Sequence, residues 1–132
     1  MAETQAAPAT GIFVWNELAT RDPETAKSLL TTLLGWKAED MDMGPNGTYT
    51  IFRSGGQRVG GCWEVKGEKY QGMPTHWLSY VSVKNADVTV KSAELLGMNI
   101  KLPVTDIPDV GRFAVLEHPA TGVFAILQPK PM

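Results

Sequence analysis

The sequence predicts an α+β fold made of two tandem βαβββ modules. Three observations predict it. A strand-like stretch is followed by an amphipathic helix and then by three short strand-like stretches. The same order recurs 63 residues further along the chain. The 132 residues suit one domain, and neither half could bury its sheet alone. We therefore expect a loose tail over residues 1–10 and a single domain over 11–132, with module one at about 11–66 and module two at about 74–129.

The first module begins with a strand over residues 12–20, followed by a helix. Asp22 can accept hydrogen bonds from the free N–H groups at the helix start, and Pro23 suits the first helical position because it has no N–H to leave unpaired. Gly35 suits the left-handed position that ends the helix. Three short strands are expected in "WKAEDMDM", "TYTIFR" and "RVGGCWEV", separated by "PNG" and "SGGQ". The apolar stripe that we expect to face the sheet is Ala26, Leu29, Leu30, Leu33 and Leu34.

The second module repeats this order. Aligning residues 13–22 with residues 76–85 places Asn85 at the position of the first helix cap. Asn85 or Asp87 is expected to cap a second helix, which ends at Gly97. Three strands are expected in "MNIKLPV", "RFAVLEH" and "VFAILQP", separated by "TDIPDVG" and "PATG". The residues expected to face inward from this helix are Val90, Ala93 and Leu96.

Charge and cysteine content exclude several classes of protein. Twelve Lys and Arg residues nearly balance fourteen Asp and Glu residues, and no basic run could follow a phosphate backbone, so nucleic acid is not expected as a partner. The single cysteine, Cys62, cannot form an internal disulfide, which favours a reducing cytoplasm. No signal peptide and no membrane-spanning apolar segment is found in the sequence. We expect a cytoplasmic protein that does not enter a membrane.

The tandem plan, with "LATRDPETAKSLLTTLLGW" in the first half and "TDIPDVGRFAVLEHPATGVFAILQP" in the second, resembles the vicinal oxygen chelate superfamily. This is the fold of glyoxalase I, bleomycin-resistance proteins and extradiol dioxygenases. The likeness covers about residues 11–129 and is greatest to small bacterial glyoxalase-like members. The resemblance implies a curved, partly open mixed sheet around a cavity. It implies an activity only loosely, because function depends on the site.

In metal-dependent members of this superfamily, His, Gln or Glu ligands come from the first and last strands of each half. The matching positions here are Trp15, Leu78, a position near Gly61 and a position near Ile126. None of these side chains offers an imidazole, thiolate or carboxylate to a cation. A one-residue slip in the alignment would bring in His76 at one position or Glu64 at another, but it would not fill all four. We expect no bound metal and no cofactor.

Strand alternation predicts which residues line a cavity. If Leu18 and Thr20 pack on the helix, then Trp15 and Glu17 face the opposite side of the sheet. A mixture of aromatic surface and a few polar groups suits a small organic ligand. The alternative is an ordinary sheet face covered by loops or by a partner chain. The residues predicted to line the pocket are Trp15, Glu17, Trp63, His76, Leu78, Tyr80 and Ile126.

Two classes of function follow from this pocket. The first is a metal-free module that binds a small, partly aromatic molecule, as bleomycin-resistance proteins of this fold do. The second is a glyoxalase-like lyase or isomerase, or a dioxygenase-type enzyme, with a displaced metal site or with Glu17 or His76 as acid or base. The vacant ligand positions favour binding over catalysis. Cys62 is expected to fill the core and His118 to lie in a turn. Because this family often builds its cavity across two chains, we expect a homodimer.

Overall fold

The computed structural model describes residues 9–107 and 110–130. Most of the predicted N-terminal tail, and part of the predicted turn "TDIPDVG", lie outside the described residues. Contacts between residues divide the chain into two units. The first unit comprises residues 15–78, and the second combines residues 9–14 with the described residues from Ser79 onward.

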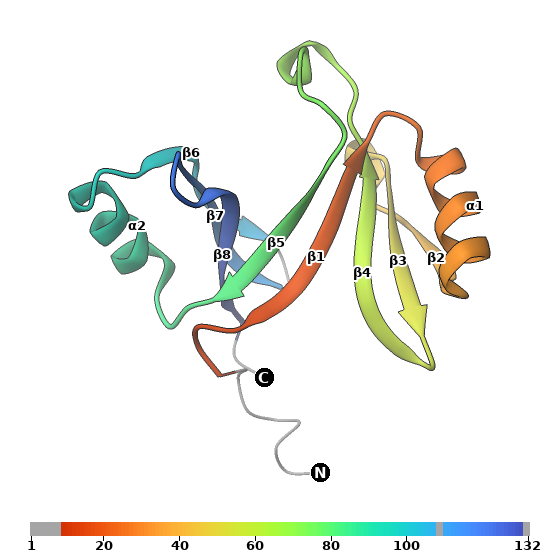
Figure 1. The fold of residues 1–132 in the computed structure, drawn as a ribbon, viewed down its shortest axis with the longest axis horizontal. Coiled ribbons are helices and arrows are strands. Elements are labelled where there is room, and N and C mark those ends of the chain that lie inside the picture. Colours follow the sequence, from red (N-terminus) through yellow and green to blue (C-terminus); the bar gives the residue numbers. More distant parts are fainter. Residues whose placement is uncertain (1–8, 108–109, 131–132) are drawn as a thin grey trace. The chain divides into compact units, whose positions relative to one another are not determined.

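The first unit holds the elements predicted for module one. Its strands are hydrogen-bonded in the order β2-β3-β4-β1. Strand β1 runs parallel to β4, and the other neighbouring pairs are antiparallel. Helix α1 lies against this sheet (Figure 1). The elements are β1 (Phe13–Thr20), α1 (Pro23–Leu34), β2 (Lys37–Asp42), β3 (Thr48–Ser54) and β4 (Gln57–Glu64), with short 3₁₀ turns η2 (Gly44–Asn46) and η3 (Glu68–Tyr70).

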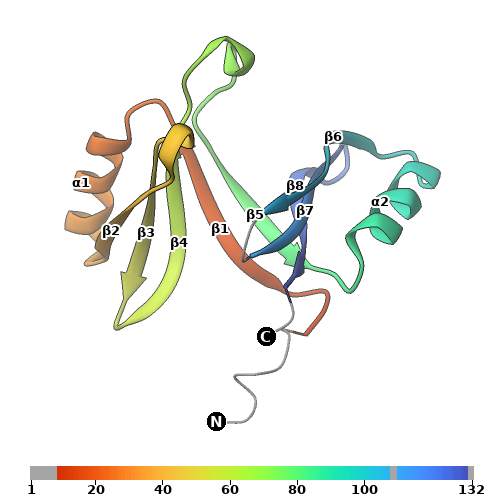
Figure 2. The same ribbon diagram turned by 180° about the vertical axis from the view of Figure 1, so that it is seen from behind.

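The second unit repeats this arrangement with the strand order β5-β8-β7-β6 (Figure 2). Strand β5 is parallel to β8, while β8, β7 and β6 are antiparallel in turn. The α+β class and the βαβββ order of both halves are therefore confirmed. The elements are β5 (His76–Ser82), α2 (Ala86–Leu95), β6 (Asn99–Ile107), β7 (Gly111–His118) and β8 (Gly122–Pro129).

The helix caps form as the sequence predicts. The Asp22 carboxylate accepts a hydrogen bond from the Thr25 N–H at 3.1 Å, and Gly35 ends α1 in the left-handed conformation with φ of 72°. Asn85 caps α2 by accepting a hydrogen bond from the Val88 N–H at 3.0 Å. Each helix start is thus stabilised by a local side chain before it packs on its sheet.

The face of α1 that packs on the sheet differs from the predicted stripe. Ala26 and Leu30 pack against the core of Leu18, Phe52 and Cys62, but Leu29 and Leu33 are 62% and 78% exposed. The helix is rotated toward Lys27, whose ammonium group lies 3.1 Å from the Asp40 carboxylate on β2. This ion pair lies on the side of α1 that meets β2, while Leu29 and Leu33 face outward.

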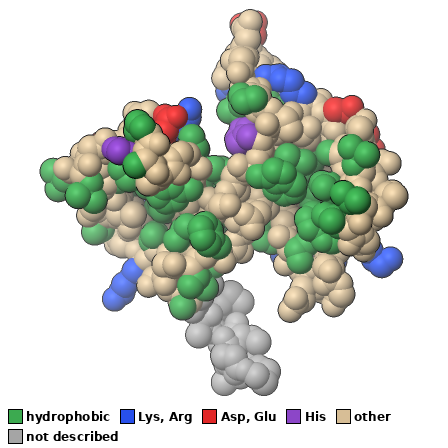
Figure 3. All heavy atoms as spheres, viewed as in Figure 1, with side chains coloured by type: hydrophobic (Ala, Val, Ile, Leu, Met, Phe, Trp, Pro, Cys, Tyr) green, Lys and Arg blue, Asp and Glu red, His purple; other side chains and the backbone are tan. Residues whose placement is uncertain are grey.

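The core of the second unit lies beneath α2 and contains Ala86, Ala93, Ala114, Leu116 and Ile126. Leu96, predicted to face inward, is 78% exposed because the helix has ended and this residue forms its C-cap. Figure 3 shows that hydrophobic side chains also reach the surface of both units. Among the described residues, neither helix has the length and apolar character needed to cross a membrane.

Candidate functional site

The register of the first unit assigns its side chains to two faces. Leu18 pairs with Cys62, and both belong to the core under α1. Glu17 pairs with Gly61 and Ala19 pairs with Trp63, so these residues share the opposite face. Trp15 shares that face as well, because it lies two residues before Glu17 on the same strand. We call it the open face of the first unit.

Three half-buried side chains on the open face form a hydrogen-bonded row. The Trp15 indole Nε1–H donates to the Tyr49 hydroxyl oxygen at 2.9 Å. The Tyr49 hydroxyl in turn donates to the Glu17 carboxylate at 2.7 Å. An indole can only donate and a carboxylate can only accept, so the direction of the row is fixed. Tyr49 thereby holds an aromatic ring and a carboxylate in one defined arrangement.

Gly61 provides the space that Tyr49 occupies. A Cβ atom placed on Gly61 would lie 2.0 Å from the Tyr49 hydroxyl oxygen and 2.4 Å from the ring carbon that carries it. Both separations are far shorter than a non-bonded contact. The absence of a side chain at Gly61 is therefore what lets the phenol of β3 reach across β4 to Trp15 and Glu17 on β1.

The environment keeps the Tyr49 proton in place. Burial raises the pKa of the Tyr49 hydroxyl well above its usual value, and the negative charge of Glu17 raises it further. Tyr49 thus acts as a hydrogen-bond donor throughout the neutral range. On the opposite face, burial raises the pKa of the Cys62 thiol to about 11, and this side chain is 1% exposed. Cys62 fills the core, as the sequence suggests, and is no nucleophile at neutral pH.

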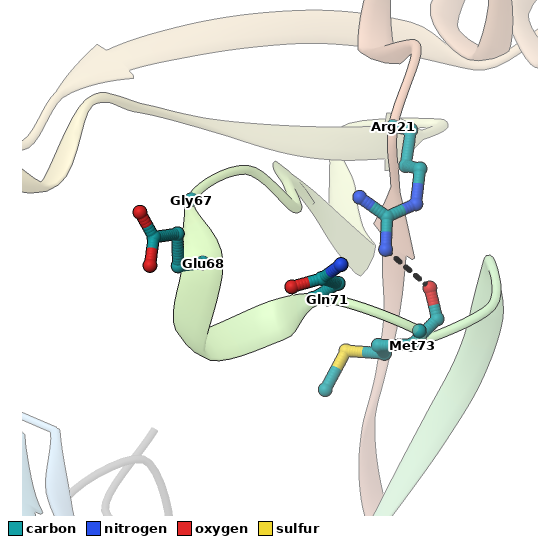
Figure 4. Close-up of a pocket in the computed structure, with 6 residues that line it drawn as sticks. Arg21, Gly67, Glu68, Gln71 and Met73 are labelled. Atoms are coloured by element: carbon teal, nitrogen blue, oxygen red, sulfur yellow. Dashed lines mark hydrogen bonds between the residues drawn. The ribbon is translucent and has the colours of Figure 1, made fainter.

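A loop with the 3₁₀ turn η3 extends the aromatic surface of the open face. The Tyr70 ring makes an edge-on contact with Trp63, with ring centroids 5.3 Å apart. The Arg21 guanidinium Nη2 donates to the backbone oxygens of Tyr70 at 2.9 Å and Met73 at 2.8 Å. Figure 4 shows Arg21 reaching from the end of β1 to this loop. A depression beside it is lined by Arg21, Gly67, Glu68, Gln71, Gly72 and Met73.

The other residues predicted to line a pocket occupy varied environments. The His76 ring Nδ1 lies 2.8 Å from the Pro74 backbone oxygen, a local contact at the start of β5, and Leu78 is half-buried in the same strand. In the second unit Tyr80 is 6% exposed, with its ring 6.0 Å from that of Phe113. Ile126 pairs with Val81 and packs beneath α2 with Ala93, so it lies on the helix side of its sheet, opposite to Tyr80.

Sequence reasoning misses Tyr49, the residue that joins Trp15 to Glu17. Alternation within "TYTIFR" places Tyr49 on the same face as Ile51, which pairs with Gly61. The hydroxyl contact, however, depends on the register of three strands, which the sequence does not reveal. Arg21 and Tyr70 are missed for a similar reason. Tyr70 lies 49 residues after Arg21, in a loop whose position beside β1 cannot be read from the sequence.

The donor set does not fit the metal that the superfamily resemblance implies. Across residues 9–107 and 110–130, no three His, Cys, Asp or Glu side chains converge as a cation requires. Two of the four ligand positions implied by the resemblance fall in the first unit. The first position carries the indole of Trp15, and at the second the Tyr49 phenol fills the space above Gly61.

Comparisons with known proteins agree with this fold. No protein-family model matches the chain. One relative is CFP32 of Mycobacterium tuberculosis, which is named as a putative glyoxylase. It is 36% identical to this chain over 122 residues, and the match covers 92% of this chain and 46% of CFP32. The anthracycline biosynthesis protein DnrV of Streptomyces peucetius is 29% identical over 129 residues, covering 89% of this chain and 47% of DnrV. The chain thus spans about half the length of the curated relatives it matches.

A solved structure with the same fold is methylmalonyl-CoA epimerase from Mycobacterium tuberculosis. Its TM-score is 0.61 at 12% identity, and the match covers 99% of this chain and 97% of the epimerase chain. The likeness in fold, the repeated βαβββ order and the glyoxylase-named relative together define the class of protein. The chain belongs to the vicinal oxygen chelate superfamily, among its glyoxalase-like members.

Proposed function

We propose that this protein binds a small, partly aromatic molecule on the open face of the first unit, without a metal ion. The observation that supports the proposal is the hydrogen-bonded row of Trp15, Tyr49 and Glu17, which occupies two positions where metal-dependent relatives are expected to carry ligands. An indole held in place by a hydrogen bond offers a ring for stacking. The nearby carboxylate offers an acceptor that would orient a ligand hydroxyl or amine.

Stacking energy and the low cost of ordering the Trp15 side chain both favour an aromatic ligand over an aliphatic one. Stacking between aromatic rings contributes about 0.5–1.5 kcal/mol beyond the area that it buries. Trp15, Tyr49 and Trp63 are all half-buried, so part of each side chain remains accessible while the rest is supported by its neighbours. Because Tyr49 already fixes the Trp15 indole, binding would cost little side-chain entropy there.

The names of the relatives are compatible with this ligand class. DnrV is named for anthracycline biosynthesis, and anthracyclines are built on fused aromatic rings. CFP32 is named for glyoxylase activity, which in metal-dependent members relies on ligand positions that are apolar here. Binding of an aromatic molecule therefore suits the residues of this chain better than metal-assisted chemistry does. The proposal includes a cytoplasmic location, which the single cysteine favours.

The test of the proposal compares Trp15→Phe and Trp15→Ala with the wild type. Calorimetric titration with 2-(hydroxymethyl)anthraquinone, a neutral three-ring probe, measures the dissociation constant of each protein. Phe should retain most of the affinity because it keeps a stacking ring. Ala should weaken binding by about tenfold or more, since loss of an aromatic anchor commonly costs over 1 kcal/mol. Trp77→Ala is the matched control, because Trp77 is 47% exposed and alternates to the other side of its strand from His76.

The variants also separate binding from folding. Each should keep the circular dichroism spectrum of the wild type, since Trp15 lies outside the core under α1. Unchanged affinity in Trp15→Ala, or equal losses in Trp15→Ala and Trp77→Ala, would remove the open face as the binding site. Global unfolding of Trp15→Ala would show instead that Trp15 serves the core.

A further inference from the structure

The aromatic surface of the open face extends beyond Trp15 and Tyr49. On β1, Ala19 lies four residues after Trp15, which is about 13 Å along a strand at about 3.3 Å per residue. Ala19 pairs with Trp63 on β4, and Trp63 is in edge-on contact with Tyr70. Trp63 also pairs with Tyr49 on its other side. Half-buried aromatic side chains therefore run from Trp15 to Tyr70 along one face.

The far end of this surface belongs to a loop rather than to the sheet. The hydrogen bonds from Gln71 N–H to the Glu68 oxygen and from Met73 N–H to the Tyr70 oxygen run within the loop. Such local bonds give the loop its shape but do not set its position on the sheet. The Tyr70 ring also has the Lys69 ammonium group 5.0 Å from its centroid, a cation–π contact within the loop itself.

Arg21 connects the loop to the sheet. Its Nη2 group donates to two backbone oxygens three residues apart in the loop, that of Tyr70 and that of Met73. Figure 4 shows the second of these hydrogen bonds. Charge-assisted hydrogen bonds of this kind are stronger than neutral ones, and the planar guanidinium fixes their direction. Arg21 follows directly after β1, so the strand that carries Trp15 and Glu17 also holds the loop that carries Tyr70.

We propose that Arg21 is a positioning residue that holds Tyr70 against Trp63, and that this contact makes the site selective for elongated, fused-ring ligands. The inference rests on the proposed function of the open face. A single-ring ligand contacts Trp15 and Tyr49 only. A ligand with three or more fused rings extends along the face to Trp63 and Tyr70, and its affinity then depends on the position of the loop.

The test uses two probes that share a hydroxymethyl group on an aromatic ring and differ in the number of rings; the longer probe also carries two ring carbonyls. 2-(Hydroxymethyl)anthraquinone has three fused rings, and benzyl alcohol has one. Both are titrated by NMR into the wild type, Arg21→Met, Tyr70→Ala and the double variant. Arg21→Met keeps a long apolar stem but removes the two hydrogen bonds. Arg58→Met removes an exposed arginine from β4 and is the matched control for Arg21→Met.

The expected result is selective. Arg21→Met and Tyr70→Ala should each weaken the three-ring probe by about fivefold or more, the effect of losing about 1 kcal/mol of contact, and change benzyl alcohol less than twofold. The double variant should lose no more than the larger single loss, because Arg21 acts through Tyr70. Arg58→Met should bind both probes as the wild type does. Amide hydrogen exchange should accelerate in residues 67–73 of Arg21→Met and stay unchanged in β1, β3 and β4.

Other outcomes overturn the inference in distinguishable ways. If the wild type binds both probes but Arg21→Met binds them equally well, Arg21 has no positioning role. If the losses for Arg21→Met and Tyr70→Ala multiply in the double variant, the two residues act independently. If the wild type binds neither probe, the proposed function fails and the ligand class fails with it. Unchanged hydrogen exchange in Arg21→Met contradicts its hold on the loop whatever the binding result.

Discussion

Gly61→Ala should disrupt the row of Trp15, Tyr49 and Glu17 while changing only one methyl group. The new Cβ would lie 2.0 Å from the Tyr49 hydroxyl oxygen and 2.6 Å from a ring carbon, so the phenol must move. Moving it breaks the 2.9 Å bond from Trp15 and the 2.7 Å bond to Glu17. A hydrogen bond between neutral groups contributes about 0.5–1.5 kcal/mol and one to a charged group about 1.5–3 kcal/mol, so the two together contribute about 2–4.5 kcal/mol.

The net change should be smaller than this sum. Replacing Gly by Ala within a strand gains about 0.5–1 kcal/mol because the unfolded chain loses freedom. We therefore expect Gly61→Ala to lower the free energy of unfolding by about 1–4 kcal/mol, measured by urea denaturation followed by circular dichroism. Affinity for the three-ring probe should fall in parallel, because the Trp15 indole loses its hydrogen-bond partner.

A double-mutant cycle shows whether the loss arises from Tyr49. In a Tyr49→Ala background no phenol stands above residue 61, so Gly61→Ala should be neutral or stabilising by up to about 1 kcal/mol. An equal destabilisation by Gly61→Ala with and without the Tyr49 ring would contradict this role of Tyr49, because the cost would then come from the strand itself.

Three further predictions concern the rest of the molecule. Burial raises the pKa of Cys62 in the folded protein to about 11, above its ordinary value of 9.0, so the stability contributed by the neutral thiol is complete below about pH 9 and is lost as the pH rises toward 11. Between pH 9 and pH 11, urea denaturation should therefore show a smaller loss of unfolding free energy for Cys62→Ala than for the wild type. Parallel plots of unfolding free energy against pH for the two proteins would contradict this. Leu30→Ala should lower the free energy of unfolding by about 1–3 kcal/mol and Leu33→Ala by less than about 0.5 kcal/mol, because only Leu30 packs on the core; equal losses would mean that Leu33 is also covered. We expect a homodimer in sedimentation at micromolar concentration, and a pure monomer there would exclude it.

Much of the fold can be predicted because its signals are local. Asp22, Gly35 and Asn85 mark helix ends by hydrogen bonds and backbone conformations that need no distant partner. The stripe on α1 was predicted only in part. Leucine spacing identifies an amphipathic helix, but the rotation of the helix on its sheet depends on packing against strands distant in sequence, and only Ala26 and Leu30 of the stripe reach the core.

The candidate site was less predictable because it depends on register. Alternation along β1 correctly separates Trp15 and Glu17 from Leu18, since every second side chain faces the same way. The link through Tyr49 requires that β3, β4 and β1 align so that a glycine lies beneath the phenol. The position chosen for Ile126 shows the same limit, since a shift of one residue moves a strand side chain to the other face of its sheet.

Binding of an aromatic ligand by the open face should need no metal ion. The most direct measurement is one calorimetric titration with 2-(hydroxymethyl)anthraquinone, performed on protein stripped with a chelator and repeated after dialysis against Zn²⁺, Ni²⁺, Mn²⁺ or Fe²⁺, with the metal content determined by elemental analysis. We predict the same dissociation constant in every sample, within about twofold, and no stoichiometric ion retained by the protein. Binding that appears only in a metal-loaded sample, with about one ion per chain that is lost in Glu17→Gln or His76→Ala, would contradict metal-free binding by the open face.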